Sequence, residues 1–523
     1  MDYDVIVIGS GFGGSVAALR LSEKGYRVGV LEMGRRISRE DMTSAIKSPL
    51  SLFWLPGLGR QGYFTQQFYK HITLVGGVGV GGGSLVYGAV LLEPKSAFYN
   101  DPAWNHLGID WQTELKPKYQ TASQMLGLTT CPIQSLQDEY LGHAAKKFKV
   151  ENTHGPVPLG IYFGPSEIES QDPYFGGAGP PRMGCTSCGA CLAGCEPGAK
   201  NSLDKNYLYL AEGLGAEILP LHKATLIRPI EDGYEIEMAH PLEAKHKYTP
   251  LRAKKVVLAA GVLGSLELLF RSREAGTLPY VSPMLGQRVR TNSEVIVGVI
   301  SRDEDIELTN GPAVSSKFDF NEHTHINQNR LAQSLWFMKL YSGPLVDGEV
   351  PARRALSTLW HIIRHPIAST ASLRAGNNWH KRMTLLTVAQ SLDNQMAFTW
   401  GRGLFGGYKH GLQSVTSSGK SAPTYIPEAN QAARAYAEVS DGIPFSSLME
   451  SVLNMSVTAH ILGGCVIGAN AEEGVINSQH EVYGYPGMYI VDASAIPANV
   501  GVNPSLTITA MAERAMSLVE DKI

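Results

Sequence analysis

Apolar residues near the N-terminus follow first the spacing of a strand and then that of a helix. Residues 3–8 (YDVIVI) are a continuous apolar, β-branched run that predicts a buried strand, and residues 15–25 carry apolar positions at helical spacing. Residues 26–31 form a second strand-like run that ends in Glu32. The turn between the first strand and the helix consists of Gly9, Ser10, Gly11, Phe12, Gly13 and Gly14.

A glycine turn between a strand and a helix is the pattern of a dinucleotide site. Gly9 permits the tight turn, Gly11 lets the backbone approach a pyrophosphate, and Gly14 lets the helix lie close to the strand. The helix N-terminus offers N–H donors, and Glu32 is placed to accept a hydrogen bond from a ribose hydroxyl. NAD and FAD proteins share this unit, so the pattern leaves the choice of dinucleotide open.

Two later segments suit the same nucleotide domain. Residues 254–270 (KKVVLAAGVLGSLELLF) predict a buried strand, a turn at Ala260 and Gly261, and a helix. Residues 76–88 (GGVGVGGGSLVYG) are too rich in glycine for the interior of a strand or helix, which favours a loop wrapped against a flat or charged ligand over a flexible surface loop. This loop contains Gly81, Gly82, Gly83 and Ser84.

The C-terminal region places a histidine and an asparagine at element boundaries. Residues 488–519 predict a strand ending at Asp492, a loop rich in Pro and Gly, and an amphipathic helix. His460 precedes a Gly-Gly turn and Asn503 precedes Pro504, so each side chain can project into a cleft. Such a pair could deprotonate an alcohol and hold its oxygen. Taken alone, His460 fits a structural histidine better than a catalytic one.

Composition narrows the class of protein. A chain of 523 residues, 44% hydrophobic and 18% charged, predicts a soluble enzyme of two domains with room for a large cofactor. A net charge of -3 gives no electrostatic footprint for nucleic acid. The first residues lack the pattern of a signal peptide, and no window has the uninterrupted apolar run of a membrane span. We therefore expect a cytoplasmic protein.

Four of the 6 cysteines lie close together in residues 184–200 (GCTSCGACLAGCEPGAK). Cys185, Cys188, Cys191 and Cys195 have the spacing C-x2-C-x2-C-x3-C on a glycine-rich loop. Soft thiolate ligands in a reducing compartment favour an iron–sulfur cluster, or else zinc. Free, packed thiols are the third alternative.

Five ordered motifs together resemble the glucose-methanol-choline (GMC) flavin oxidoreductases. These are GSGFGGS, GVGGGSLV, VLAAGVLGS, the HILGG stretch and the ending VDAS…GVNPSLTITAMAER. Within that family the chain is most similar to the bacterial cholesterol oxidase branch, and in particular to its mycobacterial members. The resemblance spans nearly the whole chain.

The resemblance implies a non-covalent FAD and an active-site pair. Glu32 would bind the adenosine ribose, and residues 81–84 would lie along the flavin. Asp492 and residues 503–507, which include Pro504 and Ser505, would close over the isoalloxazine and the pyrophosphate. His460 and Asn503 match the catalytic His and Asn of the family, with His460 accepting the hydroxyl proton while the carbon delivers hydride to flavin N5.

The implied fold is α/β, with a discontinuous Rossmann-like FAD domain and a second α+β domain that contains an antiparallel sheet. We assign residues 1–100, 185–290 and 450–523 to the FAD domain, and residues 101–184 and 291–449 to the substrate domain and lid. The expected reaction is oxidation of a secondary alcohol on a bulky hydrophobic molecule, foremost a 3β-hydroxysteroid. Alternatives are a dehydrogenase that passes electrons through a cluster to an acceptor other than oxygen, a non-redox lyase or decarboxylase on the same scaffold, and a binding or electron-transfer protein without substrate chemistry.

The chain departs from the cholesterol oxidase pattern at two places. Tyr87 stands where well-known members have an asparagine after GGGSLV. Asn327 stands where close relatives carry an acid, and Glu294, the nearest other carboxylate, is interpreted as an ordinary polar partner. We therefore do not expect isomerisation of a steroid double bond.

Residues 350–382 in the predicted lid mix apolar and basic residues. The basic residues are Arg353, Arg354, Arg364, Arg374, Lys381 and Arg382, and they neighbour Leu359, Trp360, Ile362 and Ile363. One interpretation is a lid that rests on an anionic bilayer while a lipid substrate enters. The other is a solvated face over an ordinary core helix.

Overall fold

Two seven-stranded sheets organise the chain in the computed structural model, which describes residues 1–243, 245–403, 410–417 and 419–522. The first sheet has the order β10-β2-β1-β13-β12-β11, with β23 paired to β13. Its parallel strands are β1 (Tyr3–Ile8), β2 (Val28–Glu32), β10 (Glu217–Pro220), β13 (Leu251–Leu258) and β23 (Met488–Ile490). Strands β11 (Lys223–Ile230) and β12 (Gly233–Ala239) extend it antiparallel.

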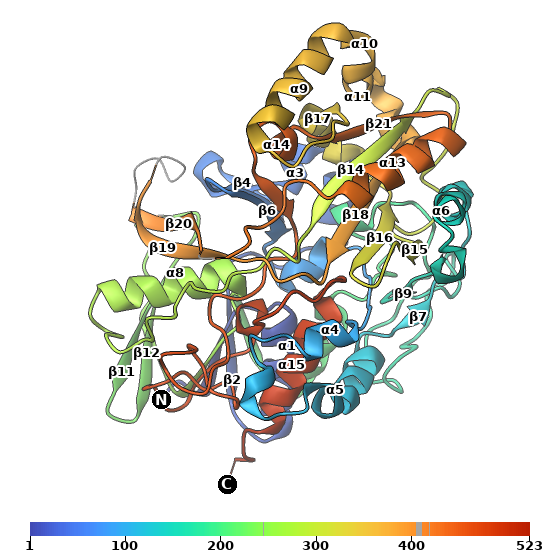
Figure 1. Ribbon diagram of the computed structural model, residues 1–523. Helices are drawn as coiled ribbons and strands as arrows, with labels where there is room; N and C mark the ends of the chain where they lie inside the picture. Colours follow the sequence, from blue (N-terminus) through green and yellow to red (C-terminus); the bar gives the residue numbers. More distant parts are fainter. Residues whose placement is uncertain (244, 404–409, 418, 523) are drawn as a thin grey trace.

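The central strands β1 and β2 are apolar runs that are buried along nearly their whole length, so both faces of the sheet must be covered there. Helix α1 (Phe12–Glu23) packs between α15 (Ser505–Ser517) and α7 (Tyr207–Gly213), and α15 also packs on α5 (Trp111–Met125). Helix α8 (Gly261–Glu274) follows β13 and packs on β11. Figure 1 shows α1, α15 and α5 grouped below the centre of the molecule.

The second sheet is antiparallel throughout and has the order β17-β21-β14-β18-β16-β15-β8. Its strands are β17 (Ser342–Pro344), β21 (Gly442–Ser447), β14 (Val295–Ser301), β18 (Met383–Gln390), β16 (Thr324–Asn329), β15 (Ser316–Asp319) and β8 (Gly155–Pro156). Helices α13 (Pro427–Val439) and α6 (Leu136–Lys147) pack on it through an alanine-rich apolar core. The predicted α/β fold with a second, antiparallel sheet is confirmed; the division into domains stays a prediction.

A small three-stranded sheet joins the glycine-rich loop to the C-terminal region. Strand β6 (Ile72–Gly77) pairs antiparallel with β5 (Phe64–Phe68) and parallel with β22 (Ser456–Thr458). Because β6 and β22 run in the same direction, the residues that follow each strand emerge at one edge. The glycine loop after β6 therefore lies beside the segment that carries His460.

The glycine-rich segment is more regular than predicted. Its first two residues complete β6, and Gly82–Leu85 form the 3-10 helix η2. Gly79, Gly81 and Gly82 have positive φ angles, which explains why glycine is needed at this sharp turn.

Candidate active site

A cavity of about 560 Å³ runs along the glycine turn at the carboxyl edge of the first sheet. This volume suits a cofactor-sized ligand. Ten of the residues predicted to bind the cofactor line it: Gly9, Gly11, Phe12, Gly13, Glu32, Gly82, Gly83, Ala260, Gly261 and Asp492.

Glycine geometry shows how closely the walls of this cavity approach one another. A Cβ on Gly13 would stand 2.1 Å from the carbonyl oxygen of Val491, and one on Gly82 would stand 2.8 Å from Cα of Gly11. A Cβ on Gly11 would meet no atom within 4 Å. Two loops thus pack backbone to backbone while open space remains beside Gly11, as a backbone cradle for a pyrophosphate requires.

Glu32 accepts hydrogen bonds from three segments that form the cradle. Its Oε2 accepts hydrogen bonds from Ser10 N (3.1 Å) and Ser10 Oγ (2.6 Å), and its Oε1 accepts from Gly34 N (2.8 Å) and Gly79 N (3.3 Å). Burial raises the pKa of Glu32. Glu32, which is predicted to bind the ribose, therefore also joins the first turn, the end of β2 and the glycine loop.

Asp492, two residues after β23, likewise accepts hydrogen bonds from two separate segments. It accepts hydrogen bonds from Ser265 Oγ (2.5 Å) and from Ser494 N (2.8 Å) and Oγ (2.5 Å). Burial raises its pKa as well. These bonds link α8 to the loop that leads towards Asn503.

Besides Asn503, five further predicted cofactor residues lie outside the lining of the cavity: Gly14, Gly81, Ser84, Pro504 and Ser505. A Cβ on Gly14 would stand 1.9 Å from the carbonyl oxygen of Gly9, so this glycine allows α1 to approach β1. Ser84 Oγ donates to the carbonyl of Gly81 and accepts from Leu203 N. Pro504 and Ser505 begin α15. All five shape the scaffold, and their contact with a cofactor stays a prediction.

His460 and Asn503 come together from separate elements. Nδ2 of Asn503 is 3.5 Å from Nε2 of His460. His460 follows β22, where its backbone N–H donates to Thr458 Oγ1 (2.8 Å), and Asn503 immediately precedes α15. Both side chains are half-buried, so a substrate can reach them.

Glu294 contacts His460 from the other side. Its Oε2 lies 3.2 Å from Nδ1 of His460 and accepts a 2.5 Å hydrogen bond from Thr458 Oγ1. Nδ1 makes no aligned hydrogen bond, so the contact is an ion-pair distance only. Glu294, interpreted from the sequence as an ordinary polar partner, thus contacts the histidine predicted to act as the base. A carboxylate that is only 2% exposed needs a specific partner, yet the local sequence does not name one.

The loop that carries Asn503 is fastened by Asn292. Asn292 Oδ1 accepts from Gly501 N (2.7 Å), and its Nδ2 donates to the carbonyl of Val502 (2.9 Å). Asn292 and Ser293 both have positive φ angles, which turns the chain just before β14. Residues 290–294 (RTNSE) therefore contact His460 through Glu294 and hold the loop of Asn503 through Asn292, which sequence reasoning did not predict.

Alternate side chains of β16 form a polar row that ends at Asn503. Nδ2 of Asn327 donates to Oδ1 of Asn503 (3.3 Å), and Nδ2 of Asn329 donates to Oδ1 of Asn327 (3.2 Å). Residues two apart on a strand share a face. Asn327, at the position where close relatives carry an acid, therefore contacts Asn503 through its amide.

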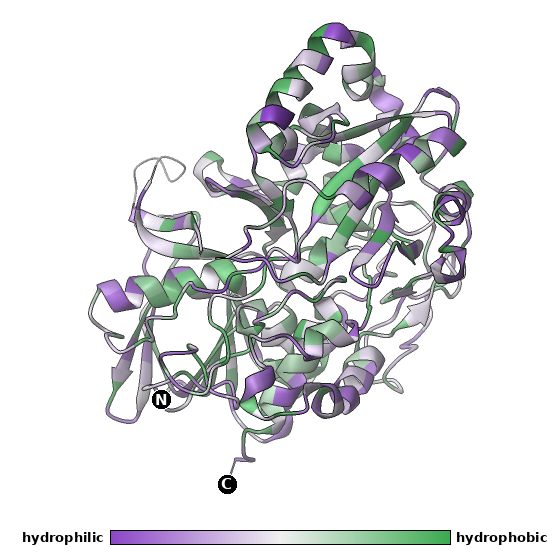
Figure 2. Cartoon of the chain, in the orientation of Figure 1, coloured by the Kyte–Doolittle hydropathy of each residue, from purple (hydrophilic) through white to green (hydrophobic). Residues whose placement is uncertain are grey.

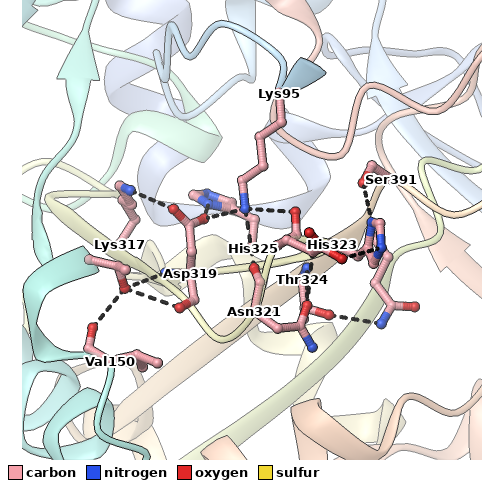
Figure 3. A network of polar contacts seen from close by, with 12 residues as sticks. Lys95, Val150, Lys317, Asp319, Asn321, His323, Thr324, His325 and Ser391 are labelled. Carbon is pink, nitrogen blue, oxygen red and sulfur yellow. Dashed lines mark hydrogen bonds and ion pairs between the residues drawn. The ribbon is translucent and has the colours of Figure 1, made fainter. Parts of the chain in front are cut away.

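His325 lies two residues before Asn327 on β16 and belongs to the polar network that Figure 3 shows. Its Nδ1 is 3.0 Å from Oδ1 of Asp319, which also pairs with Lys317 (3.0 Å) and Lys95 (3.2 Å). Burial acts to raise the pKa of Asp319, but His325 and the two lysines hold it well below its usual range. The network attaches β15 and β16 to the segment after the glycine loop.

The structure does not support the predicted metal cluster. All four cysteines of the run line one small cavity, but within the described ranges no three His, Cys, Asp or Glu side chains are grouped so that they could hold a metal ion. All six cysteines are free, and burial raises the pKa of the Cys185 thiol to about 11. A suitable spacing of cysteines in the sequence does not ensure that their Sγ atoms converge on one point. The cysteines of this loop are therefore best described as free thiols.

Lys200 connects the cysteine loop to the glycine loop. Its buried Nζ donates to the carbonyls of Leu85 (2.9 Å), Tyr87 (3.2 Å) and Cys191 (2.7 Å), and burial lowers its pKa to about 8. The hydroxyl of Tyr87 donates to the carbonyl of Asn201 (2.8 Å), and its ring packs edge-on against Phe12. The departure at Tyr87 thus lies in the wall behind the glycine turn.

Comparison with known proteins decides the family. A cholesterol oxidase of Mycobacterium tuberculosis is 41% identical over 100% of this chain and 92% of its own length. The chain belongs to the GMC oxidoreductase family. The GMC oxidoreductase family model matches residues 382–512, and an NAD(P)-binding Rossmann-like model matches residues 7–59. A cholesterol oxidase of Acinetobacter baumannii is 38% identical over 100% of this chain and 95% of its length.

The fold of this GMC oxidoreductase has a solved counterpart. Pyridoxine 4-oxidase from Mesorbium loti covers 98% of each chain with a TM-score of 0.61 at 14% identity. Membership of the family makes the chain an FAD-dependent alcohol oxidase or dehydrogenase, which confirms the predicted enzyme class and cofactor. The backbone cradle and the carboxylates of Glu32 and Asp492 fit the FAD expected in the GMC family.

Proposed function

We propose that the chain oxidises the 3β-hydroxyl group of a steroid such as cholesterol and passes the electrons to oxygen. The curated relatives from Mycobacterium tuberculosis and Acinetobacter baumannii, both named cholesterol oxidase, support the substrate class. The observation that carries the chemistry is the 3.5 Å approach of Asn503 Nδ2 to His460 Nε2 beside the glycine loop.

His460 accepts the hydroxyl proton at Nε2, and Asn503 holds the substrate oxygen through its amide. The carboxylate of Glu294 favours the tautomer with the proton on Nδ1, which leaves the Nε2 lone pair free to act as the base. Asn327 fixes the orientation of the Asn503 amide by donating to its Oδ1. Bound FAD supplies the hydride acceptor, so that alcohol and oxygen become ketone and hydrogen peroxide.

Anaerobic titration with a steroid panel, followed by admission of air, tests this proposal. A 3β-hydroxysteroid should bleach the flavin band in the dark, and air should restore it with one equivalent of peroxide for each ketone. Its 3α epimer is the matched control and should react far more slowly. Reduction without reoxidation by air would indicate a dehydrogenase, and absence of bleaching by any alcohol would contradict redox chemistry.

His460→Ala separates the proposed base from cofactor binding. Loss of the base should lower the rate of flavin reduction by about 10²–10⁴-fold while the flavin absorbance of the purified protein stays unchanged. Unchanged reduction by the same steroid would refute the assignment of His460.

A further inference from the structure

Helix α9 (Pro351–Arg364) carries its apolar stripe on the outside of the molecule. Leu356, Leu359, Trp360 and Ile363 follow the spacing i, i+3, i+4, i+7 of one helix face and are 69%, 47%, 58% and 70% exposed. A surface helix of a globular protein normally turns such a stripe towards the core. Here the stripe faces solvent, so its orientation is the inverse of the usual one.

The opposite side of α9 is buried and polar. Arg354 is 2% exposed and donates to the carbonyl of Gly348 (2.7 Å), to Thr424 Oγ1 (2.7 Å) and to the carbonyl of Glu450 (3.1 Å). Thr358, one turn later, is fully buried. These specific bonds fix the rotation of the helix, and the outward direction of the stripe is therefore built into the fold.

The apolar surface continues beyond α9. Ile367, in α10 (Pro366–Ser369), is 71% exposed, and Leu373, in α11 (Ala371–Arg374), is 45% exposed. Figure 1 shows α9, α10 and α11 as a projection at the top of the molecule, and Figure 2 shows hydrophobic colour along it. We call the exposed apolar residues of α9 to α11 the apical patch: Leu356, Leu359, Trp360, Ile363, Ile367 and Leu373.

The charge within residues 350–382 is positive only, and the exposed carboxylates of Asp347 and Glu349 lie just before this segment. Arg353, Arg364 and Arg374 are exposed, and the structure records no ion pair for these three residues within its described ranges. The sequence from Val350 to Arg382 contains no Asp or Glu, although the whole chain has a net charge of -3. The guanidinium of Arg364 lies 5.1 Å from the centre of the Trp360 ring, so a cation and an aromatic ring project together.

We propose that the apical patch docks on an anionic phospholipid bilayer. Leucine, isoleucine and tryptophan side chains would enter the boundary between headgroups and acyl chains, and the arginines would bind lipid phosphates. The charge decides for an anionic bilayer over a second copy of the chain, because two positively charged patches would repel each other. None of the helices in the described part of the chain is long and apolar enough to cross a membrane, so this contact is peripheral.

Hydrogen bonds connect α9 to the segment that carries Glu294. A role of docking in the uptake of a steroid substrate rests on the proposed function. The carbonyl of Glu450, in α14 (Leu448–Ser451), accepts from Arg354, and its buried side chain Oε1 accepts from Ile296 N (3.4 Å). Ile296 is two residues from Glu294, the partner of His460. Hydrogen bonds through Glu450 therefore link α9 to the strand that follows Glu294.

Sedimentation with vesicles free of sterol tests the proposal without any catalytic step. The holoenzyme should bind vesicles of phosphatidylcholine with about one third phosphatidylglycerol, and binding should weaken at about 0.5 M salt and on pure phosphatidylcholine. The double variant Trp360→Asp with Ile363→Asp should lose more than about tenfold in partition coefficient. Arg364→Glu with Arg374→Glu should lose binding to anionic vesicles selectively.

Matched controls come from exposed residues elsewhere on the chain. Ile168→Asp changes an isoleucine that is likewise 70% exposed, and Lys116→Glu reverses an exposed charge on α5; both should bind like the wild type. Flavin absorbance and oxidation of a detergent-solubilised steroid should be unchanged in all variants, which separates docking from catalysis. Vesicle binding equal in the wild type and the patch variants would overturn the proposal. So would a dimer in sedimentation velocity that the patch variants abolish.

Discussion

The carboxylate of Glu294 stands 3.2 Å from Nδ1 of His460, while the opposite ring nitrogen of that histidine stands 3.5 Å from the amide of Asn503. The three side chains come from the segment before β14, the segment after β22 and the residue before α15. A histidine held between a carboxylate and an amide has one nitrogen for orientation and one for proton transfer. This arrangement gives the first prediction.

Glu294→Gln should lower kcat by on the order of tenfold or more with little change in KM. The amide keeps the shape of the side chain but removes the carboxylate that orients the His460 ring from the Nδ1 side. Steady-state oxidation of the best steroid, with full pH profiles, measures the effect. Glu473→Gln is the control, because Glu473 forms a surface pair with His106 at 3.1 Å. Equal kcat in the Glu294 variant and the wild type would remove Glu294 from the mechanism.

Gly82→Ala should weaken FAD binding by on the order of tenfold. Gly82 has a φ of +53°, and a Cβ there would stand 2.8 Å from Cα of Gly11, so the two glycine turns must separate. Titration of the apoprotein with FAD, followed by quenching of flavin fluorescence, measures the dissociation constant. Gly213→Ala, where a Cβ meets no atom within 4 Å, should leave it unchanged. A Gly82 variant with normal affinity would show that the cradle tolerates the added atom.

His480 should make the protein less stable in acid. Burial lowers its pKa from 6.5 to about 4. Between these values the unfolded chain binds a proton that the folded chain does not, so stability falls as pH falls from about 6.5 towards 4. The full shift corresponds to about 3 kcal/mol of unfolding free energy.

The variant His480→Asn should flatten this dependence, because asparagine does not titrate and tolerates the positive φ of 67° at this position. Urea unfolding at several pH values measures the free energy of unfolding. His143→Asn, at an exposed histidine, is the control and should keep the acid dependence of the wild type. A slope that persists in the His480 variant would assign the effect to other groups.

The cysteine run should behave as free thiols. Cys188 is exposed while the other three are buried or half-buried, so one thiol should react quickly with an aromatic disulfide reagent in the folded protein. All 6 cysteines should react after unfolding, and anaerobically purified protein should contain neither iron nor acid-labile sulfide in stoichiometric amount. Stoichiometric iron with four protected thiols would show that the cysteine run holds a cluster.

Local sequence predicted those parts of the fold that depend on local interactions. Strand β1, the glycine turn and α1 follow from an apolar run, from glycines that alone permit the turn, and from helical spacing. His460 and Asn503 were predicted as a catalytic pair from their places at element boundaries together with the family resemblance. The antiparallel second sheet was expected only through the family resemblance, since its strands pair residues far apart in sequence.

Only the tertiary structure decided which side chains meet. Glu294, Asn292 and Asn327 carry no local pattern, and they reach His460 and Asn503 because β14 begins, and β16 passes, beside these two residues. The cysteine spacing predicted a cluster that the packing of the loop does not support. For residues 350–382, the sequence favoured a solvated face over an ordinary core helix and left a membrane-facing lid as the alternative, because an amphipathic pattern does not say which face is covered. The bonds of Arg354 settled the direction of α9, since a buried guanidinium must find acceptors and its acceptors lie beneath the helix.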